Sequence, residues 1–411
     1  MVNPLKRILQ NLFLAGSSLS LALLIVELVG RFVIEPVNFL RPQLINDSIL
    51  GHAIRPASGG HDAWGFRNRS VPVSAKIVTV GDSQTYGASA PAKDSWPSIL
   101  SELSKRSVYN LSLGGYGPVQ YFHLLTSKAV QLSPGVVIVG FYLGNDLLES
   151  YELVQNNPHW VKLKRSGSSP LLEHVSSTSV SAQPTEDPAS FFPELRTWLA
   201  QRSIIYNILI YSVVGEMARL AEAVFVSRQS AGDANVRYDK KGIYTGFTPE
   251  RRLKALDLKD PRVNEGLLIS LDLFARMKAY CLEHAIHLLV VLIPTKESVY
   301  ARYLENDPAF EKIAAIKSLL INERTVTAKV KAFFEDHGIA YINLLPQLQE
   351  RVARLQLYPG NFDGHPNQNG YRVIAESVEE YLRQLTPQAA GSGHLVPIDH
   401  TASGPPSINN R

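Results

Sequence analysis

Short runs of apolar and β-branched residues recur along the chain, and glycine-containing turns follow several of them. Each run is too short for a buried helix and almost wholly apolar, which is the pattern of parallel strands buried on both faces of a sheet. The five predicted strands are 76–80, 107–113, 136–140, 287–293 and 339–344.

Stretches with helical patterning separate these runs. They predict helices over 95–105, 118–128, 264–284, 323–337 and 371–385, and Pro118 is typical of a first helical turn. Strands that alternate with helices favour a three-layer α/β domain of flavodoxin-like type, with a parallel sheet.

The amino-terminal pattern is different, because Ile8–Val26 contains no charged residue. As a helix this segment is about 28 Å long, close to the bilayer core of about 30 Å. Lys6 and Arg7 precede it, and no small-residue cleavage site follows it. We therefore predict an uncleaved transmembrane signal anchor over 8–30. A cleaved signal peptide and a buried core helix are the alternatives, and because Arg31 follows the segment the positive-inside bias is slight.

The rest of the chain divides around the α/β pattern. Residues 31–72 are predicted to form a connector, and 73–385 a domain interrupted by an insertion over 151–265. Within the insertion, 165–190 is a Ser-rich loop and 191–226 a long helix, predicted to cap the domain or to touch a membrane. Residues 386–411 are predicted to be a disordered tail.

Composition narrows the function classes. The 411 residues carry a net charge of +4, spread along the chain, which argues against nucleic-acid binding. A single cysteine excludes an internal disulfide framework and a cysteine-rich metal site. No motif for a metal, nucleotide or cofactor is present, so no cofactor and no metal are expected.

Four polar segments fall where carboxyl ends of predicted strands, or the start of the last helix, meet one edge of the sheet. Ser83 in Gly-Asp-Ser follows the first strand, Gly115 the second and Asn145 the third, and Asp363-Gly364-His365 precedes the last helix. A serine at a helix start, a histidine base and an acid that orients it form a nucleophilic system. Backbone N–H groups and an amide nearby can stabilise an oxyanion. On its own, the first segment favours a simple helix cap over a nucleophile.

In this order, the four segments resemble the blocks of the SGNH/GDSL hydrolase family, over about 73–385. The resemblance implies an SGNH fold, with Ser83 as nucleophile, His365 as general base and Asp363 as its partner. It also implies an oxyanion hole of the Ser83 and Gly115 backbone N–H groups and the Asn145 side chain. Trp64–Asn68 and Leu292–Lys296 look like segments of membrane-anchored bacterial members.

Two departures from the family pattern bear on the chemistry. The family usually has Asp-x-x-His, whereas this chain has Asp363-Gly364-His365, as in proteins of the alginate-acetylation type. The shorter spacing favours acyl transfer or leaves the orientation of His365 in question. Gln84-Thr85 follows the serine, where the name-giving motif has Ser-Leu, and anchored members commonly vary there.

We therefore expect a serine esterase, anchored in a bacterial inner membrane by one span and acting outside the cytoplasm. The expected partners are an O-acetylated cell-surface or exported glycan, or a small acyl ester, together with components of polysaccharide export. Competing functions are an O-acetyltransferase, a lipolytic esterase or thioesterase with 204–214 lining its acyl pocket, and a catalytically silent glycan-binding or scaffold protein. Lys296, just after the fourth strand, is a weak candidate for contact with an anionic substrate; the competing expectation is a solvated lysine.

Overall fold

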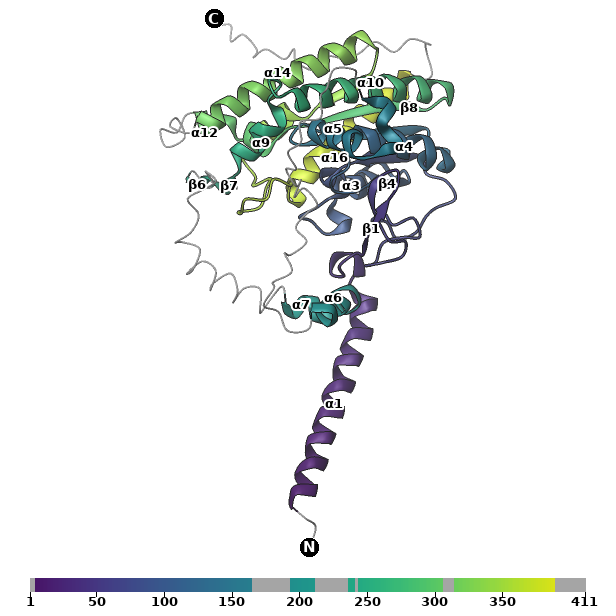
Figure 1. The fold of residues 1–411 in the computed structure, drawn as a ribbon, viewed down its shortest axis with the longest axis vertical. Helices are drawn as coiled ribbons and strands as arrows, with labels where there is room; N and C mark the ends of the chain where they lie inside the picture. Colours follow the sequence, from purple (N-terminus) through teal and green to yellow (C-terminus); the bar gives the residue numbers. More distant parts are fainter. Residues whose placement is uncertain (1–3, 165–192, 211–235, 241–242, 306–313, 389–411) are drawn as a thin grey trace, which may run out of the picture.

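The computed structural model describes residues 4–164, 193–210, 236–240, 243–305 and 314–388. A long amino-terminal helix, α1 (Pro4–Val33), projects from an α/β domain (Figure 1). The predicted Ser-rich loop and the predicted tail from 389 onward lie outside the described residues. Helix α16 (Gln368–Gln388) takes in residues 386–388, which the sequence assigned to that tail.

Five strands form the central sheet in the order β4-β3-β5-β8-β9, and every strand is parallel to its neighbours. Their bounds are β3 Ile77–Gly81, β4 Val108–Ser112, β5 Val136–Tyr142, β8 His287–Ile293 and β9 Ala340–Asn343. Nearly all residues of β3, β5 and β8 are buried, as their apolar sequences require. The predicted fold class is confirmed, and each of the five strands lies within two residues of its predicted bounds.

Helices cover both faces of this sheet. On one face α3 (Trp96–Ser104) packs against α16, while α4 (Pro118–Ser127), α10 (Pro261–Glu283) and α14 (Ala314–Asp336) lie on the other (Figure 1). The chain leaves β3 toward β4 and then crosses back to β5, so the topological switch point lies between β3 and β5. In open α/β sheets, ligands bind at the carboxyl ends of the strands at this point.

The predicted connector contains a β-hairpin that the sequence did not reveal, β1 (Leu44–Asp47) with β2 (Gly51–Ile54). The Asp47 carboxylate closes its turn by accepting from the backbone N–H groups of Ile49 and Leu50. The turn ends at Gly51, whose φ of +82° favours glycine. These strands have four residues each and lack a clear alternation, so the pattern gave no strand signal.

The predicted insertion is shorter than expected, because α5 (Asp146–Asn156) and α10 extend into it from the two sides. Its described elements are a 3₁₀ helix (Pro158–Leu163), α6 (Pro193–Arg202), α7 (Ile204–Ile208), the hairpin of β6 (Val236–Lys240) and β7 (Ile243–Phe247), and α9 (Pro249–Leu256). The remaining short helices of the domain are α2 (Ser83–Tyr86), α11 (Lys296–Val299), α12 (Ala301–Glu305) and α15 (Leu345–Arg351).

The prediction of one continuous helix over 191–226 is wrong in the described part. Ser203 has an extended backbone and separates α6 from α7, because its hydroxyl accepts from the N–H of Tyr206 and caps the second helix. α7 packs against α1 rather than over the α/β domain. The Glu27 carboxylate on α1 stabilises this contact with α7, because it accepts from Ser203 Oγ and from the N–H groups of Ile204 and Ile205.

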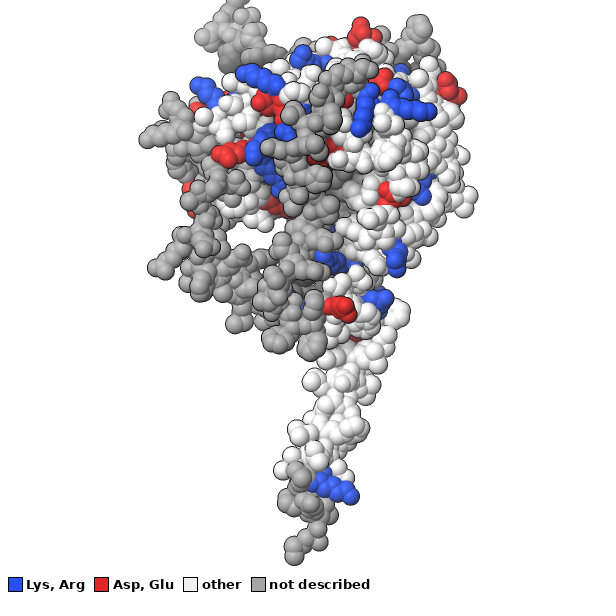
Figure 2. All heavy atoms as spheres, in the orientation of Figure 1, with Lys and Arg blue, Asp and Glu red and all other residues white. Residues whose placement is uncertain are grey.

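Helix α1 itself is apolar and exposed. Lys6–Val33 is the one helix, among the described residues, that is long and apolar enough to cross a membrane. None of its most apolar window is buried inside the protein, which contradicts the alternative of a buried core helix. Figure 2 shows this helix free of charged atoms between the basic residues at its amino end and the charges near the domain.

Candidate active site

Ser83 follows the carboxyl end of β3 by two residues and is the first residue of α2. Asp82 is completely buried and caps this short helix, because its Oδ1 accepts from the N–H of Gln84 at 2.8 Å. The helix-cap interpretation of the sequence therefore applies to Asp82. The neighbouring Ser83 side chain stays half-exposed at the edge of the sheet.

His365 and Asp363 come to Ser83 from the loop before α16. His365 Nε2 lies 2.8 Å from Ser83 Oγ, and His365 Nδ1 lies 2.5 Å from Asp363 Oδ1. The same Asp363 oxygen accepts from the backbone N–H of His365 at 3.0 Å. The side chains of His365 and Asp363 are 23% and 30% exposed, so the pair is sheltered and still reachable. The three predicted residues thus form one hydrogen-bonded chain, despite the short Asp-Gly-His spacing.

Asp363 is held ionised by its neighbours. Burial works against its charge, but hydrogen bonds from His365 and from the Ser89 hydroxyl hold the pKa of Asp363 well below its usual range. An ionised carboxylate on Nδ1 keeps the proton there and leaves Nε2 free to accept one from Ser83. Ser89 was not singled out in the sequence, because it belongs to no motif.

Lys296 is not the solvated lysine that the sequence favoured. Only 2% of it is exposed, and its Nζ donates to the carbonyl oxygens of Asn361 and Asp363, each at 3.0 Å. Burial lowers the pKa of Lys296 to about 8. The ammonium group therefore binds the backbone of the loop that carries Asp363 and His365. Its contact with a substrate stays a prediction.

The glycine turn after β4 lies against the nucleophile. A Cβ on Gly114 would lie 3.4 Å from Ser83 Cβ, and Gly115 has a φ of +79° that favours glycine. The connector hairpin holds this turn in place, because His52 Nε2 lies 2.9 Å from the Gly114 oxygen and Tyr116 donates to the His52 carbonyl. The turn that contains the predicted oxyanion donor Gly115 thus lies against Ser83 through Gly114.

Asn145 ends the turn after β5, on the other side of the switch point. Its Nδ2 donates to Glu149 Oε1 at 2.7 Å, which engages one of the two amide hydrogens and leaves the other for a ligand. Glu149 is buried one helical turn further along α5. Sequence reasoning missed this partner, because a glutamate four residues after an asparagine is usually a solvated helix residue.

Buried carboxyl groups lie behind this edge of the sheet. Burial raises the pKa of Asp82 to about 6, and it raises those of Asp146 and Glu149 well above their usual values. Repulsion from Asp82 adds to the shifts of both Asp146 and Glu149, and Glu152 adds further to that of Glu149. Burial thus disfavours the charged form of all three carboxyl groups.

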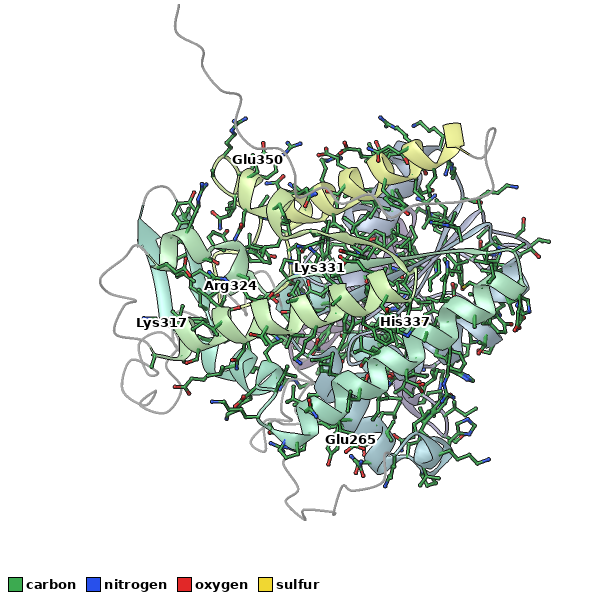
Figure 3. All side chains as sticks on the ribbon, turned by 90° about the horizontal axis from the view of Figure 1, so that it is seen from above. Glu265, Lys317, Arg324, Lys331, His337 and Glu350 are labelled. Carbon is green, nitrogen blue, oxygen red and sulfur yellow. The ribbon has the colours of Figure 1, made fainter. Side chains whose placement is uncertain are left out.

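A cavity elsewhere in the domain is a poorer candidate. It has a volume of about 450 Å³ and lies along α14, where Arg324 and Lys331 line it (Figure 3). Arg324 pairs with Glu305 at 2.7 Å, and Lys331 lies over the Tyr341 ring. The guanidinium group of Arg324 is thus already paired with a carboxylate. Among the described residues, no group of three or more His, Cys, Asp or Glu side chains is placed to hold a metal ion.

No family model and no curated protein matches this chain. Solved structures that are similar to it include a GDSL-like lipase from Bacteroides thetaiotaomicron, with 11% identity, 75% of this chain and 88% of that chain covered, and a TM-score of 0.33. A catalytic mutant of an acetylxylan esterase from Geobacillus stearothermophilus has 10% identity, covers 77% and 95%, and has a TM-score of 0.36. An acetyl xylan esterase from Butyrivibrio proteoclasticus has 11% identity, covers 77% and 66%, and has a TM-score of 0.31.

Proposed function

We propose that this protein is an SGNH-type serine esterase that hydrolyses O-acetyl esters through an acyl-Ser83 intermediate. The observation that carries the proposal is the hydrogen-bonded chain from Ser83 Oγ through His365 to Asp363. A nucleophile, a base in contact with it and an acid that orients the base are the parts that acyl transfer needs.

In the proposed reaction, His365 Nε2 takes the Ser83 proton as Ser83 Oγ attacks the ester carbonyl. The developing oxyanion is stabilised by the Ser83 and Gly115 backbone N–H groups and by the free amide hydrogen of Asn145. His365 then gives the proton to the departing alcohol, and water repeats the sequence on the acyl-enzyme. Loss of one oxyanion donor is worth about 3–4 kcal/mol in such sites, a rate factor of about 10² to 10³.

The substrate we favour is an O-acetylated cell-surface or exported glycan. Its support is the apolar helix α1, proposed to anchor the protein in a bacterial inner membrane with the α/β domain outside the cytoplasm, together with the sequence resemblance. An O-acetyltransferase uses the same acyl-enzyme and differs only in the acceptor, so it is the second candidate. Partners in polysaccharide export belong to the same proposal.

A lipolytic enzyme and a silent scaffold have less support. In a lipolytic enzyme 204–214 would line an acyl pocket, but the described part of that segment packs in α7 against α1. The case for a silent scaffold is the short Asp-Gly-His spacing. Against the scaffold, Asp363 and Ser83 both contact the His365 ring despite the short spacing.

The test is fluorophosphonate labelling and ester turnover of the full chain in detergent. We expect Ser83→Ala to abolish labelling and to lower turnover of aryl acetate by at least about 10³-fold, since no base-activated nucleophile remains. Ser127→Ala is the matched control, because Ser127 is the last residue of α4. It therefore lies at the opposite edge of the sheet from the start of that helix. Aryl octanoate distinguishes a lipolytic enzyme, and acetyl transfer to added oligosaccharide a transferase. If the wild-type chain neither labels nor turns over either ester, the proposed function is wrong.

A further inference from the structure

Arg252 reaches the candidate site from α9, an element of the insertion rather than of the central α/β fold. Its Cζ lies 5.4 Å from the centre of the Tyr142 ring, at the end of β5 and three residues before Asn145. It is also close to Gly364, between Asp363 and His365, where an added Cβ would lie 2.7 Å from Arg252 Nη2. The guanidinium group is therefore close to both the segment that carries the predicted oxyanion donor Asn145 and the segment that carries the base.

The guanidinium group has no acceptor in the part of the chain that the structure describes. No carboxylate lies within ion-pair distance of it, and no oxygen accepts a hydrogen bond from it there. Arg67, by contrast, donates to the carbonyl oxygens of Gly87 and Ala90. Arg252 is also only half-buried, so its donors remain open to a ligand. A sheltered cation with free donors is a site for an anion.

The surrounding charges keep Arg252 ionised without neutralising it. Burial opposes its charge, but the field of Tyr142, Glu297 and Asp82 outweighs this and raises the pKa of Arg252. Burial raises the pKa of the nearby Glu149 well above its usual value. The Glu297 carboxylate accepts from the backbone N–H of Thr248.

We propose that Arg252 is the anion-binding residue of the substrate site, and that it binds a carboxylate carried by the molecule whose ester is cleaved. The planar guanidinium group offers paired N–H donors that match the two oxygens of a carboxylate. The substrate class is then an ester of an acidic compound, such as an O-acetylated glycan that contains uronic acids. The inference rests on the proposed esterase function and adds its specificity.

The test compares two substrates that differ only in charge, 4-acetoxybenzoate and 4-acetoxybenzamide, on the full chain in detergent; the 3-substituted isomers vary the reach. We expect the wild type to prefer the anionic ester in kcat/KM, and Arg252→Met to lower kcat/KM for it by about tenfold or more, with less than threefold change for the amide. A charge-assisted pair in a sheltered site accounts for this difference. Arg252→Lys keeps the charge and loses the paired donors, so an intermediate loss is expected.

Arg251→Met is the matched control, because Arg251 is the neighbouring residue on α9 and is exposed. It removes the same charge from the chain, and we expect it to leave the preference for the anionic ester over the neutral amide unchanged. Equal losses on both substrates in Arg252→Met, or a wild type without preference for the anion, would overturn the inference. Failure of the wild type on the neutral amide as well would instead count against the proposed esterase.

Discussion

Lys296 carries an ammonium group although only 2% of the residue is exposed, and this burial lowers its pKa. Its pKa falls from 10.5 to about 8 because burial disfavours the charged form. Between pH 8 and 10.5 the unfolded chain therefore binds more protons than the folded chain, so the free energy of unfolding rises with pH through this window. The full effect is about 3 kcal/mol. A neutral amine keeps two N–H donors, so both bonds to the loop survive deprotonation.

We expect urea unfolding of the wild type to show this rise, relative to Lys296→Met, between pH 8 and 10.5. The variant lacks the titrating group and also the ties to the Asn361 and Asp363 carbonyls. Its kcat should therefore fall more than its KM changes, because the loop that carries the base is less well placed. Parallel stability curves for the wild type and Lys296→Met would contradict the assigned pKa shift.

At the residue scale, sequence and structure agree for residues that belong to a motif. They differ for residues whose surroundings depend on how the elements pack. Ser83, His365 and Asp363 were singled out because their motifs follow predicted strands or precede the last helix in a recognisable order, although the Asp-Gly-His spacing is short. Lys296 was expected to be solvated, because a lysine after a strand usually is. Glu149 and Arg252 carried no signal, since their importance depends on which residues the fold brings beside them.

At the scale of elements, the position of α2 on the sheet depends on two glycines. A Cβ on Gly140 of β5 would lie 2.0 Å from Thr85 Oγ1, and one on Gly81 of β3 would lie 2.2 Å from the same atom. The helix that begins at Ser83 can therefore lie directly on the two strands flanking the switch point. Thr85 Oγ1 is buried and has no hydrogen-bond partner among the described residues.

Gly140→Ala should accordingly destabilise the protein by about 1–3 kcal/mol, because the methyl group overlaps the Thr85 hydroxyl. Thr85→Ala alone removes an unpaired hydroxyl and one buried methyl group, so we expect it to cost about 1 kcal/mol, all of it from the methyl group. The double variant should recover most of the loss, because the Thr85 Cβ lies 3.4 Å from the added methyl group, an ordinary contact. Chemical unfolding of the four proteins measures the coupling, and additive effects would contradict this account.

The elements themselves were largely predictable. Buried parallel strands appear in a sequence as short apolar runs. The pattern therefore predicted the bounds of β3, β4, β5, β8 and β9 closely. The β1–β2 hairpin was missed because four-residue strands on a partly exposed ribbon have no distinctive pattern. The break at Ser203 was missed because a helix cap inside an apolar stretch differs little from an ordinary helical serine, and here the carboxylate of Glu27 completes the cap from another element.

For the whole molecule, if α1 spans a bilayer, its contact with the insertion fixes the positions of α6 and α7 relative to the membrane surface. Ile8–Val26 fills the apolar core, so Glu27 lies at its boundary. The Glu27 carboxylate accepts from Ser203 Oγ at 3.0 Å, which holds the start of α7 at that same level. Trp198 on α6 is 52% exposed in the protein, and tryptophan favours the membrane interface.

We therefore expect Trp198 to contact lipid when the full chain is reconstituted into vesicles that contain brominated lipids. The chain has four tryptophans, and Trp96 is fully buried in the domain. Quenching by lipids brominated near the headgroup should exceed quenching by lipids brominated near the chain ends, and Trp198→Phe should remove most of it. If the chain floats with the vesicles but Trp198→Phe leaves the quenching unchanged, α6 does not lie at the membrane surface. If the chain does not float with the vesicles, the prediction that α1 is a membrane anchor is wrong, and the Ser83 site acts on a substrate away from the bilayer.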